Sequence, residues 1–409
     1  MSSSMHNIKK RNFTLSSALI STLLLTHIPH GLADDALIEQ KIEHLEKEIV
    51  TLKSDVAKNN RKQKSIQTAF DEFKERLKIN GFMSAGLAQS NRDRLYDGVG
   101  NDLTTLNLGK MGLQTNFRIN SDTEAVVQML GRARNNDWDL GAQWAYVSHL
   151  ISSNFNIKVG RMRLRTFNRS ADIDVSYAYP WVEPPNHAYY MLPFQNYDGI
   201  ELEYLFESAD WTYKMALYSG ENHVTPGGSD LNNKDMIGYD FTASGEDLSL
   251  RLGVGRAHAE FAWDKYGIDI KPDAWFSSLG FNYDTGNWFI TGEFTRRDVA
   301  DPLVSDVNGG YLSAGKRFEH YLPYITVSRA KTTDNDERDG LLAEVFNVQE
   351  TGYMLGVRRD LITGVAVKFQ VEYLTNFGGS NGRFDTEFTS PHIDFDNATL
   401  WSLALDAVF

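Results

Sequence analysis

The 409-residue sequence contains no cysteine, which excludes a disulfide framework and a thiolate metal site. This composition suits an oxidising compartment. Beyond the N-terminal segment there is no apolar run of about 18 residues, which excludes a bundle of membrane-spanning helices. Mean hydropathy is low, at −0.38, yet 12% of the residues are aromatic. Low hydropathy is compatible with a membrane β-barrel, because half of the side chains on each alternating strand are polar.

Residues 1–33 have the three parts of a secretory signal peptide. A basic segment, 9–11, precedes the apolar stretch 15–25, and the small residues at 31–33 suit cleavage. The alternative is a membrane anchor helix, but the apolar stretch is short and Pro29 follows it soon after. We therefore expect the mature chain to begin with the next residue.

A heptad repeat occupies residues 34–78, which contain no proline or glycine and carry ten charges of each sign. Apolar residues alternate at spacings of four and three, a pattern that predicts a coiled coil. A stripe this narrow requires partner helices, because it is not stable alone. The expected seam consists of Ile38, Ile42, Leu45, Ile49, Leu52, Val56, Asn59, Gln63, Ile66, Phe70, Phe73 and Leu77.

Several features of this rod have alternative interpretations. Asn59 and Gln63 are either polar layers that set the register or a weak point of the seam. The rod either pairs with other chains or lies on the protein's own surface, where a wider apolar stripe is usual. β-branched residues in one seam set with leucine in the other favour two strands, so dimer and trimer are both alternatives.

After the rod, apolar residues alternate with polar ones, which is the period of a β-strand. Val367 and Phe369, for example, share one face and Lys368 lies on the other. Phase slips near Gly109 and Gly160 predict β-bulges. The expected strands lie near 79–89, 104–118, 123–133, 138–150, 154–166, 196–206, 209–219, 234–243, 246–258, 273–283, 286–298, 306–317, 319–331, 351–360, 363–376 and 398–409.

Unequal connections between these strands indicate how the sheet is arranged. Links from odd to even strands are mostly long, as in 167–195 and 377–397, whereas the others are tight, as at Ser244-Gly245. Outer-membrane barrels have long loops outside and short turns in the periplasm. We therefore expect an all-β membrane protein over 79–409, a closed antiparallel transmembrane barrel of about sixteen strands, preceded by the α-helical coiled coil. Both barrel ends fall on the short-turn side, which places the rod in the periplasm.

A row of basic residues precedes the third long loop. A lysine or arginine that faces lipid at mid-membrane would cost about 2–4 kcal/mol, so an inward orientation is favoured. We expect a basic wall on one side of the lumen, with Met162 and Leu164 facing lipid. The wall consists of Arg132, Arg134, Lys158, Arg161, Arg163 and Arg165, and Lys110 is a further candidate.

The third long loop, 167–195, is rich in proline and aromatic residues. Proline restricts φ, so the loop can keep one shape, and we expect it to fold inward and narrow the lumen. Its acids would face the basic wall and create a transverse field that filters solutes by charge. Alternatively the loop is a surface lid or an oligomer contact, or the arginines only pair with its carboxylates and hold it. The candidate constriction residues are Asp172, Asp174, Tyr177, Tyr179, Trp181 and Glu183.

Signals for catalysis or for a bound cofactor are weak. Six histidines fall in the barrel region without metal-ligand spacing, and no nucleophile motif accompanies them. We therefore expect no enzyme activity, no cofactor, no metal and no nucleic-acid partner.

The final strand, 398–409, has one apolar face and ends on Phe409. Alternate residues from Phe409 back to Thr399 form that face, whereas Ser402 and Asp406 lie opposite. This is the pattern of a strand between lipid and water.

Over residues 79–409 the chain resembles the Gram-negative trimeric porins. The resemblance rests on sixteen expected strands, a constriction-like third loop and the terminal Phe409, which outer-membrane barrels typically present to their assembly machinery. The segments V-G-R-M-R-L-R and D-V-S-Y-A-Y-P-W-V-E-P-P look like one porin-like group, and a coiled coil before the barrel is similar in layout to the DcaP-like porins. The resemblance implies that Arg161, Arg163 and Arg165 form the basic side of the constriction and Asp172, Asp174 and Glu183 its acidic side.

The resemblance also implies a homo-oligomer, a trimer of separate pores in the outer membrane, in contact with lipid and lipopolysaccharide. Its function would be passive diffusion of small hydrophilic solutes, and the basic wall on the strands adds a weak preference for anions. Alternatives are an envelope tether whose rod binds peptidoglycan, and an outer-membrane hydrolase that would use His187 or His258. Inward-facing acids weaken the anion preference, namely Glu201, Glu203, Glu293 and Glu372.

Overall fold

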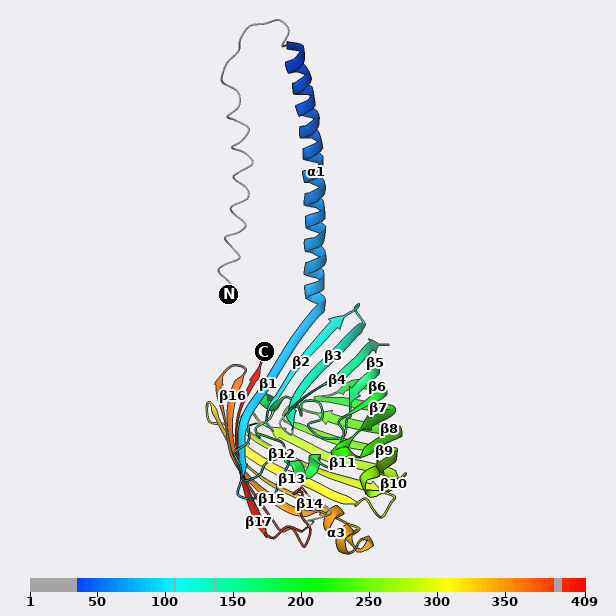
Figure 1. The fold of residues 1–409 in the computed structure, drawn as a ribbon, viewed down its shortest axis with the longest axis vertical. Coiled ribbons are helices and arrows are strands. Elements are labelled where there is room, and N and C mark those ends of the chain that lie inside the picture. Colours follow the sequence, from blue (N-terminus) through cyan, green and yellow to red (C-terminus); the bar gives the residue numbers. More distant parts are fainter. Residues whose placement is uncertain (1–34, 106–107, 135–136, 386–391) are drawn as a thin grey trace. The chain divides into compact units, whose positions relative to one another are not determined.

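The computed structural model describes residues 35–105, 108–134, 137–385 and 392–409 (Figure 1). The chain divides into two compact units, with the boundary between Glu72 and Phe73. The expected signal peptide, residues 1–33, lies outside the described residues.

Helix α1 (Asp35–Arg76) has 42 residues. At 1.5 Å per residue it is roughly 60 Å long. Its expected seam is uncovered in the single chain, as the exposed fractions of Ile49 (46%) and Leu52 (62%) illustrate. One seam assignment was wrong, because Leu77 is the first residue of strand β1 and not the last of the helix.

The rest of the chain is dominated by one antiparallel sheet. Its strands are β1 (Leu77–Ser90), β2 (Lys110–Arg118), β3 (Thr123–Arg134), β4 (Asp137–Leu150), β5 (Phe155–Arg163), β6 (Asn196–Ser208), β7 (Trp211–Val224), β8 (Asp230–Ser244), β9 (Leu248–Trp263), β10 (Ile268–Ile270), β11 (Asp273–Asp284), β12 (Trp288–Val299), β13 (Val307–Lys316), β14 (Tyr321–Thr332), β15 (Gln349–Ile362), β16 (Val365–Thr375) and β17 (Asn397–Val408). Short helical turns lie between them: η1 (Ser176–Ala178), α2 (Asn186–Tyr189), η2 (Pro226–Gly228), η3 (Asp264–Tyr266), η4 (Asn335–Glu337) and α3 (Gly340–Phe346).

The sheet closes on itself. Each long strand pairs with the next, and β1 pairs with both β2 and β17, as in the partners Phe82 and Val408. Within the described ranges there are sixteen long strands and the three-residue β10, so the expected closed barrel of about sixteen strands is confirmed. No helix in the part of the chain that the structure describes is both long and apolar enough to cross a membrane.

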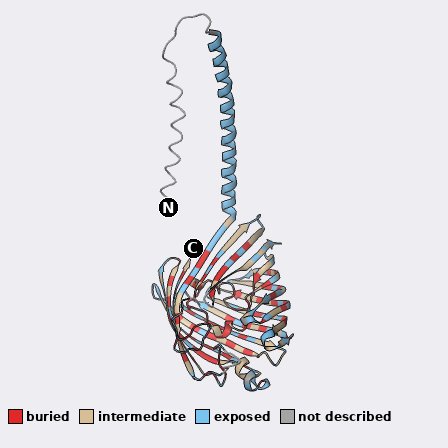
Figure 2. Ribbon diagram, in the orientation of Figure 1, coloured by how far each residue is buried: buried red, intermediate tan, exposed pale blue. Residues whose placement is uncertain are grey.

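Buried and exposed residues alternate along many strands of this barrel (Figure 2). On β16, Lys368 and Gln370 are buried on the inner side, whereas Phe369 and Tyr373 are exposed on the outer side. On β15, Leu355 is 64% exposed on the outer side. This alternation follows from the two-residue period of a strand, and it gives the barrel an apolar exterior.

Several expected strand boundaries and both expected bulges were wrong. β2 begins at Lys110 and not at residue 104, and β5 ends at Arg163. The pairing of β5 continues through Gly160 without a shift, and Gly109 lies outside the strands. Register shifts occur instead at 128–129, 220–222, 234–237 and 360–362. The sequence prediction also missed β10.

The two ends of the barrel meet at Phe409 and Gly81. The Gly81 amide donates to the Phe409 carbonyl at 2.7 Å, and the Phe409 amide donates back at 2.9 Å. A Cβ at position 81 would lie 2.3 Å from the Phe409 ring, so a residue larger than glycine would clash with that ring. The ring itself is 76% exposed.

Candidate functional site

Residues 164–195 leave the sheet after β5 and return to it at β6. The Leu164 amide donates to the Gln195 carbonyl at 2.8 Å, which draws the two ends of this segment together. Near its start, Ser170 Oγ accepts hydrogen bonds from two backbone amides, those of Thr166 and Phe167. The middle of the segment is fully buried at Trp181. We call residues 164–195 the inner loop.

Hydrogen bonds attach the inner loop to inward-facing side chains of the wall. Trp181 Nε1 donates to Ser313 Oγ at 3.2 Å and to Thr326 Oγ1 at 3.0 Å. Lys368 Nζ donates to the carbonyls of Ser176 and Trp181, the latter at 2.8 Å. These partners are on β13, β14 and β16, so the loop lies inside the barrel against that side.

Apolar packing strengthens the same attachment. The ring of Trp181 meets that of Tyr311 edge-on at 5.6 Å, and Tyr189 packs beside them. The backbone approaches the wall most closely at Gly309, where a Cβ would lie 2.2 Å from the His187 carbonyl. This close approach of the loop backbone leaves no room for a side chain, so β13 requires glycine at position 309.

On the opposite side, Asp174 joins the loop to two arginines of the expected basic wall. Its carboxylate pairs with Arg132 on β3 and Arg163 at the end of β5. The side-chain amide oxygen of Gln195 accepts a further hydrogen bond from each arginine, at 2.8 and 2.7 Å. Only 4% of the Asp174 side chain is exposed, so this is a buried three-charge contact.

A second charged group lies on the wall itself. Lys158 Nζ is 3.0 Å from Glu201 Oε1 and 2.8 Å from Glu203 Oε2. Arg165, near the start of the inner loop, pairs with both of these glutamates, and Lys214 Nζ lies 2.7 Å from Glu203 Oε1. Lys158, Arg165 and Lys214 therefore pair with carboxylates of the wall and not with those of the inner loop.

The expected orientation of Arg161 was wrong. Since β5 pairs without a shift, alternation places Arg161 on the face opposite Lys158, where it pairs with Asp198 at 2.7 Å. Arg163 is two residues further on, but it is the last residue of the strand and its guanidinium reaches Asp174 and Gln195 of the inner loop. Met162 shares the inner face and is 2% exposed, so it faces the interior and not lipid. Leu164 is likewise buried inside, beyond the end of the strand.

The remaining candidates of the loop have separate partners. Asp172 pairs with Arg169 within the loop at 3.0 Å. The Tyr177 carbonyl accepts from Arg358 on β15, whose guanidinium stacks over the Tyr177 ring. The Tyr179 hydroxyl donates to the Ile173 carbonyl at 3.0 Å.

Glu183 contributes the most exposed of the expected acids. Its carboxylate lies 3.2 Å from Lys110 Nζ on β2, and its side chain is 51% exposed. The side chain of Arg134 lies outside what the structure describes. The structure thus brings loop acids and wall cations into direct contact, and not into two separated rows.

Sequence reasoning missed a charged cluster around the tip of the loop. His187 Nε2 lies 2.8 Å from Glu350 Oε1, and both side chains are fully buried. Tyr96 donates to the same carboxylate oxygen at 2.7 Å, and Arg383 stacks on the Tyr96 ring. The sequence carries no local signal for this cluster, because its members come from four distant segments.

Two cavities flank the inner loop. The first, of about 130 Å³, lies between the loop, residues 96–99, Leu108 and strands β15–β17. The second, of about 110 Å³, is lined by Lys158, Arg163, Arg165 and Arg251 among others. Within the described ranges, no group of three or more histidine, aspartate or glutamate side chains is arranged to hold a metal ion.

The ion pairs of Asp174 with Arg132 and Arg163 should break only in strong acid. Burial alone would raise the pKa of Asp174, but the guanidiniums of Arg163 and Arg132 outweigh it and lower this pKa from 3.8 to about 2. A carboxyl with a depressed folded pKa stabilises the fold above its normal pKa, and this stability is lost as the pH falls through the folded value. Thermal unfolding in detergent should therefore show a loss between pH 4 and pH 2 that the variant D174N lacks. An equal acid loss in both proteins would contradict the assignment.

Comparison with known proteins supports the architecture. No family model matches the sequence, and no curated protein matches it. The anion-selective porin from Comamonas acidovorans is similar in structure, with a TM-score of 0.57 at 13% identity, over 81% of this chain and 99% of that one. The outer-membrane channel DcaP of Acinetobacter baumannii gives 0.53 at 11% identity, over 81% and 97%. The outer-membrane protein OmpT of Vibrio cholerae gives 0.53 at 15% identity, over 81% and 97%. With sixteen long antiparallel strands closed on themselves, the chain has the fold of the Gram-negative outer-membrane porins.

Proposed function

We propose that the protein is an outer-membrane porin through which small hydrophilic solutes diffuse passively. The observation that carries this proposal is the contrast between the two faces of the wall. Charged side chains such as Lys158 and Glu201 lie inside, whereas Ile200 and Leu217 are exposed outside. Charges inside a wide barrel require water, and an apolar exterior suits lipid.

The inner loop is the proposed constriction, and its surroundings favour anions weakly. The charged groups on this side of the lumen contain six cations and four carboxylates, an excess of two positive charges. The cations are Lys110, Arg132, Lys158, Arg163, Arg165 and Lys214, and the carboxylates are Asp174, Glu183, Glu201 and Glu203.

The remaining parts have roles in export and assembly in this proposal. Residues 1–33 direct export, and Phe409 presents the last strand to the barrel assembly machinery. The uncovered seam of α1 favours association with the same helix of other copies, as a periplasmic coiled coil of a trimer. A channel that assembles in this way has no need of a catalytic role, so we propose that the protein is not an enzyme.

Planar-bilayer recording tests the proposed function. The purified mature protein should insert with stepwise increases in ion conductance, and a salt gradient should give a reversal potential displaced slightly towards anions. Heat-unfolded protein is the control and should give no steps. Folded protein that produces no steps would refute the porin function. Normal steps from a variant lacking 38–76, together with a loosened envelope in cells, would favour the additional role of a tether.

A further inference from the structure

The first cavity differs from the second in the charge of the side chains that line it. It is lined by three acidic residues, Asp97, Glu183 and Glu372, and by no lysine, arginine or histidine. The wall on the other side of the inner loop is rich in cations. The loop thus separates a basic compartment from an acidic one.

Two of the three acids in the cavity already have cationic partners at its edge. Asp97 lies 2.7 Å from Arg383, and Glu183 lies 3.2 Å from Lys110. Glu372 differs from both, because no described residue donates a hydrogen bond to it or pairs with it. Only 8% of Glu372 is exposed, and its side chain lines the cavity.

A carboxylate buried in this way is costly unless a counter-charge offsets it. The basic residues near Glu372 have other direct partners: His187 lies beside Glu350, and Arg383 lies 2.7 Å from Asp97. A ligand that brings a positive charge into the cavity would give Glu372 the direct partner that no described side chain provides.

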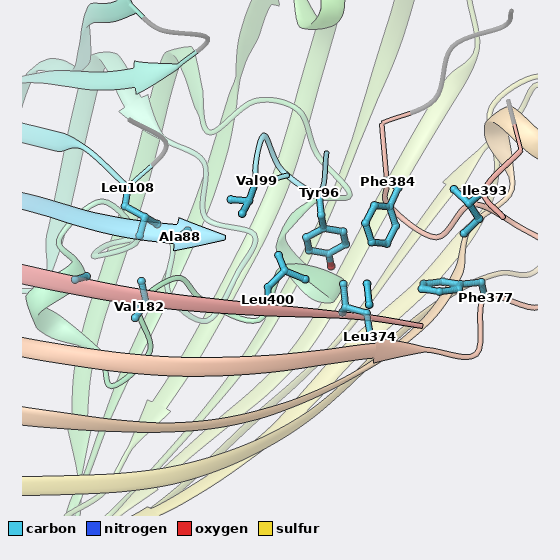
Figure 3. Close-up of a cluster of buried hydrophobic side chains, with 12 residues drawn as sticks. Ala88, Tyr96, Val99, Leu108, Val182, Leu374, Phe377, Phe384, Ile393 and Leu400 are labelled. Carbon is cyan, nitrogen blue, oxygen red and sulfur yellow. The ribbon is translucent and has the colours of Figure 1, made fainter. Parts of the chain in front are cut away.

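Part of the remaining cavity wall is apolar, although Asn186, Gln370 and Ser402 also line it. Val99, Leu108, Val182 and Leu400 belong to one buried cluster (Figure 3) and also line the cavity. A volume of about 130 Å³ is several times the 10–15 Å³ that one water requires by the same measure, so a small organic molecule fits. The cavity thus combines a charged end with an apolar body.

A divalent metal ion is a poor match for this site. Calcium takes six to eight oxygen ligands, and magnesium needs a near-ideal octahedron. No cluster of three or more acidic or histidine ligands occurs among the residues that the structure describes. An ammonium group makes lower demands, because it needs only a few acceptors and can keep an apolar stem in the same pocket.

We propose that this cavity binds a small organic cation, with the ammonium group on Glu372 and an alkyl stem against the apolar wall. The inference goes beyond the proposed porin function, since it does not require that the barrel conducts. It means that the protein has a selective site for amines on the acidic side of the inner loop.

Calorimetric titration of the folded, full-length mature protein in detergent tests this proposal, with n-butylammonium as the probe. The expected result is binding at one site per chain, with much weaker binding of 1-butanol and butyrate. Loss of the charged partner in E372Q should reduce the affinity about tenfold or more. The matched control is E293Q, because Glu293 is also a buried, inward-facing glutamate, 5% exposed, that does not line the cavity.

Two outcomes would overturn the proposal. One is equal affinity of E372Q and E293Q for n-butylammonium. The other is a wild-type protein that binds butyrate or 1-butanol as tightly as n-butylammonium, a comparison that needs no variant to fold. Since the titration is made in detergent, its result is separate from that of the conductance recording.

Discussion

Replacement of Lys368 by methionine should give a channel with larger and noisier conductance. Lys368 Nζ holds two carbonyls of the inner loop, those of Ser176 and Trp181, and pairs with Asp406 at 2.8 Å. Both charged side chains are fully buried. Breaking a buried pair of this kind typically costs about 3–5 kcal/mol, so the loop should lose its attachment to β16 and the barrel some stability. Single-channel recording and thermal unfolding measure the two effects.

Two further variants separate loosening of the loop from general destabilisation. D406N removes the charge of the partner but leaves Lys368 free to hold the loop, so its conductance should stay near that of the wild type. K234M is a matched control, because Lys234 is half-exposed and pairs only with Glu260 among the described residues. If K368M conducts like the wild type, Lys368 does not position the loop.

Neutralising the two loop acids, in the double variant D174N/E183Q, should make the channel clearly anion-selective. Asp174 is the partner of Arg132 and Arg163, and Glu183 is the partner of Lys110. Without these carboxylates, three cations at the constriction lose their counter-charges, and fixed charges of one sign favour ions of the other. The reversal potential in a salt gradient should move strongly towards the value for a pure anion channel.

Two further variants test the direction in which the reversal potential moves. R132Q/R163Q should move the reversal potential in the opposite direction, even if both double variants loosen the loop. D198N removes one acid from the outer face, beside Arg161, and should leave selectivity unchanged. A potential that is the same in D174N/E183Q and in the wild type would rule out these pairs as part of the selectivity filter.

The strands were predictable because alternation is local. Every second residue is apolar from Val365 to Tyr373 in β16 and from Trp401 to Ala407 in β17, and the two strands pair without a register shift. Leu77 shows the limit of such patterns, since it fits both the heptad of the helix and the alternation of the strand. Where two periods overlap at one residue, the boundary is decided by pairing with β2.

The direction in which side chains point at the constriction was harder to predict than the positions of the strands. Gly160 suggested a bulge, and a bulge there would have turned Arg161 inwards. The pairing of β5 with β6 is unbroken at this point, and this pairing is a property of two strands and not of one. Asp174 and Glu183 were among the candidates, but their contacts with Arg132 and Lys110 bridge 42 and 73 residues.

The attachments of the inner loop could not be inferred from sequence at all. Lys368 was correctly expected on the inner face, yet its bonds to the loop span 192 and 187 residues. The same holds for His187 and Glu350, which meet only because the loop lies inside the closed barrel. Such contacts depend on how the loop folds back, and sequence spacing does not encode that path.

If the protein is a porin, water and small solutes pass the inner loop within the closed barrel. This passage is measured most directly by the swelling of liposomes that contain the folded protein, in isotonic solutions of sugars of increasing size. Swelling should be rapid with the smallest sugar, and its rate should fall steeply with solute size. Liposomes with folded, inserted protein that swell no faster than empty ones would contradict it.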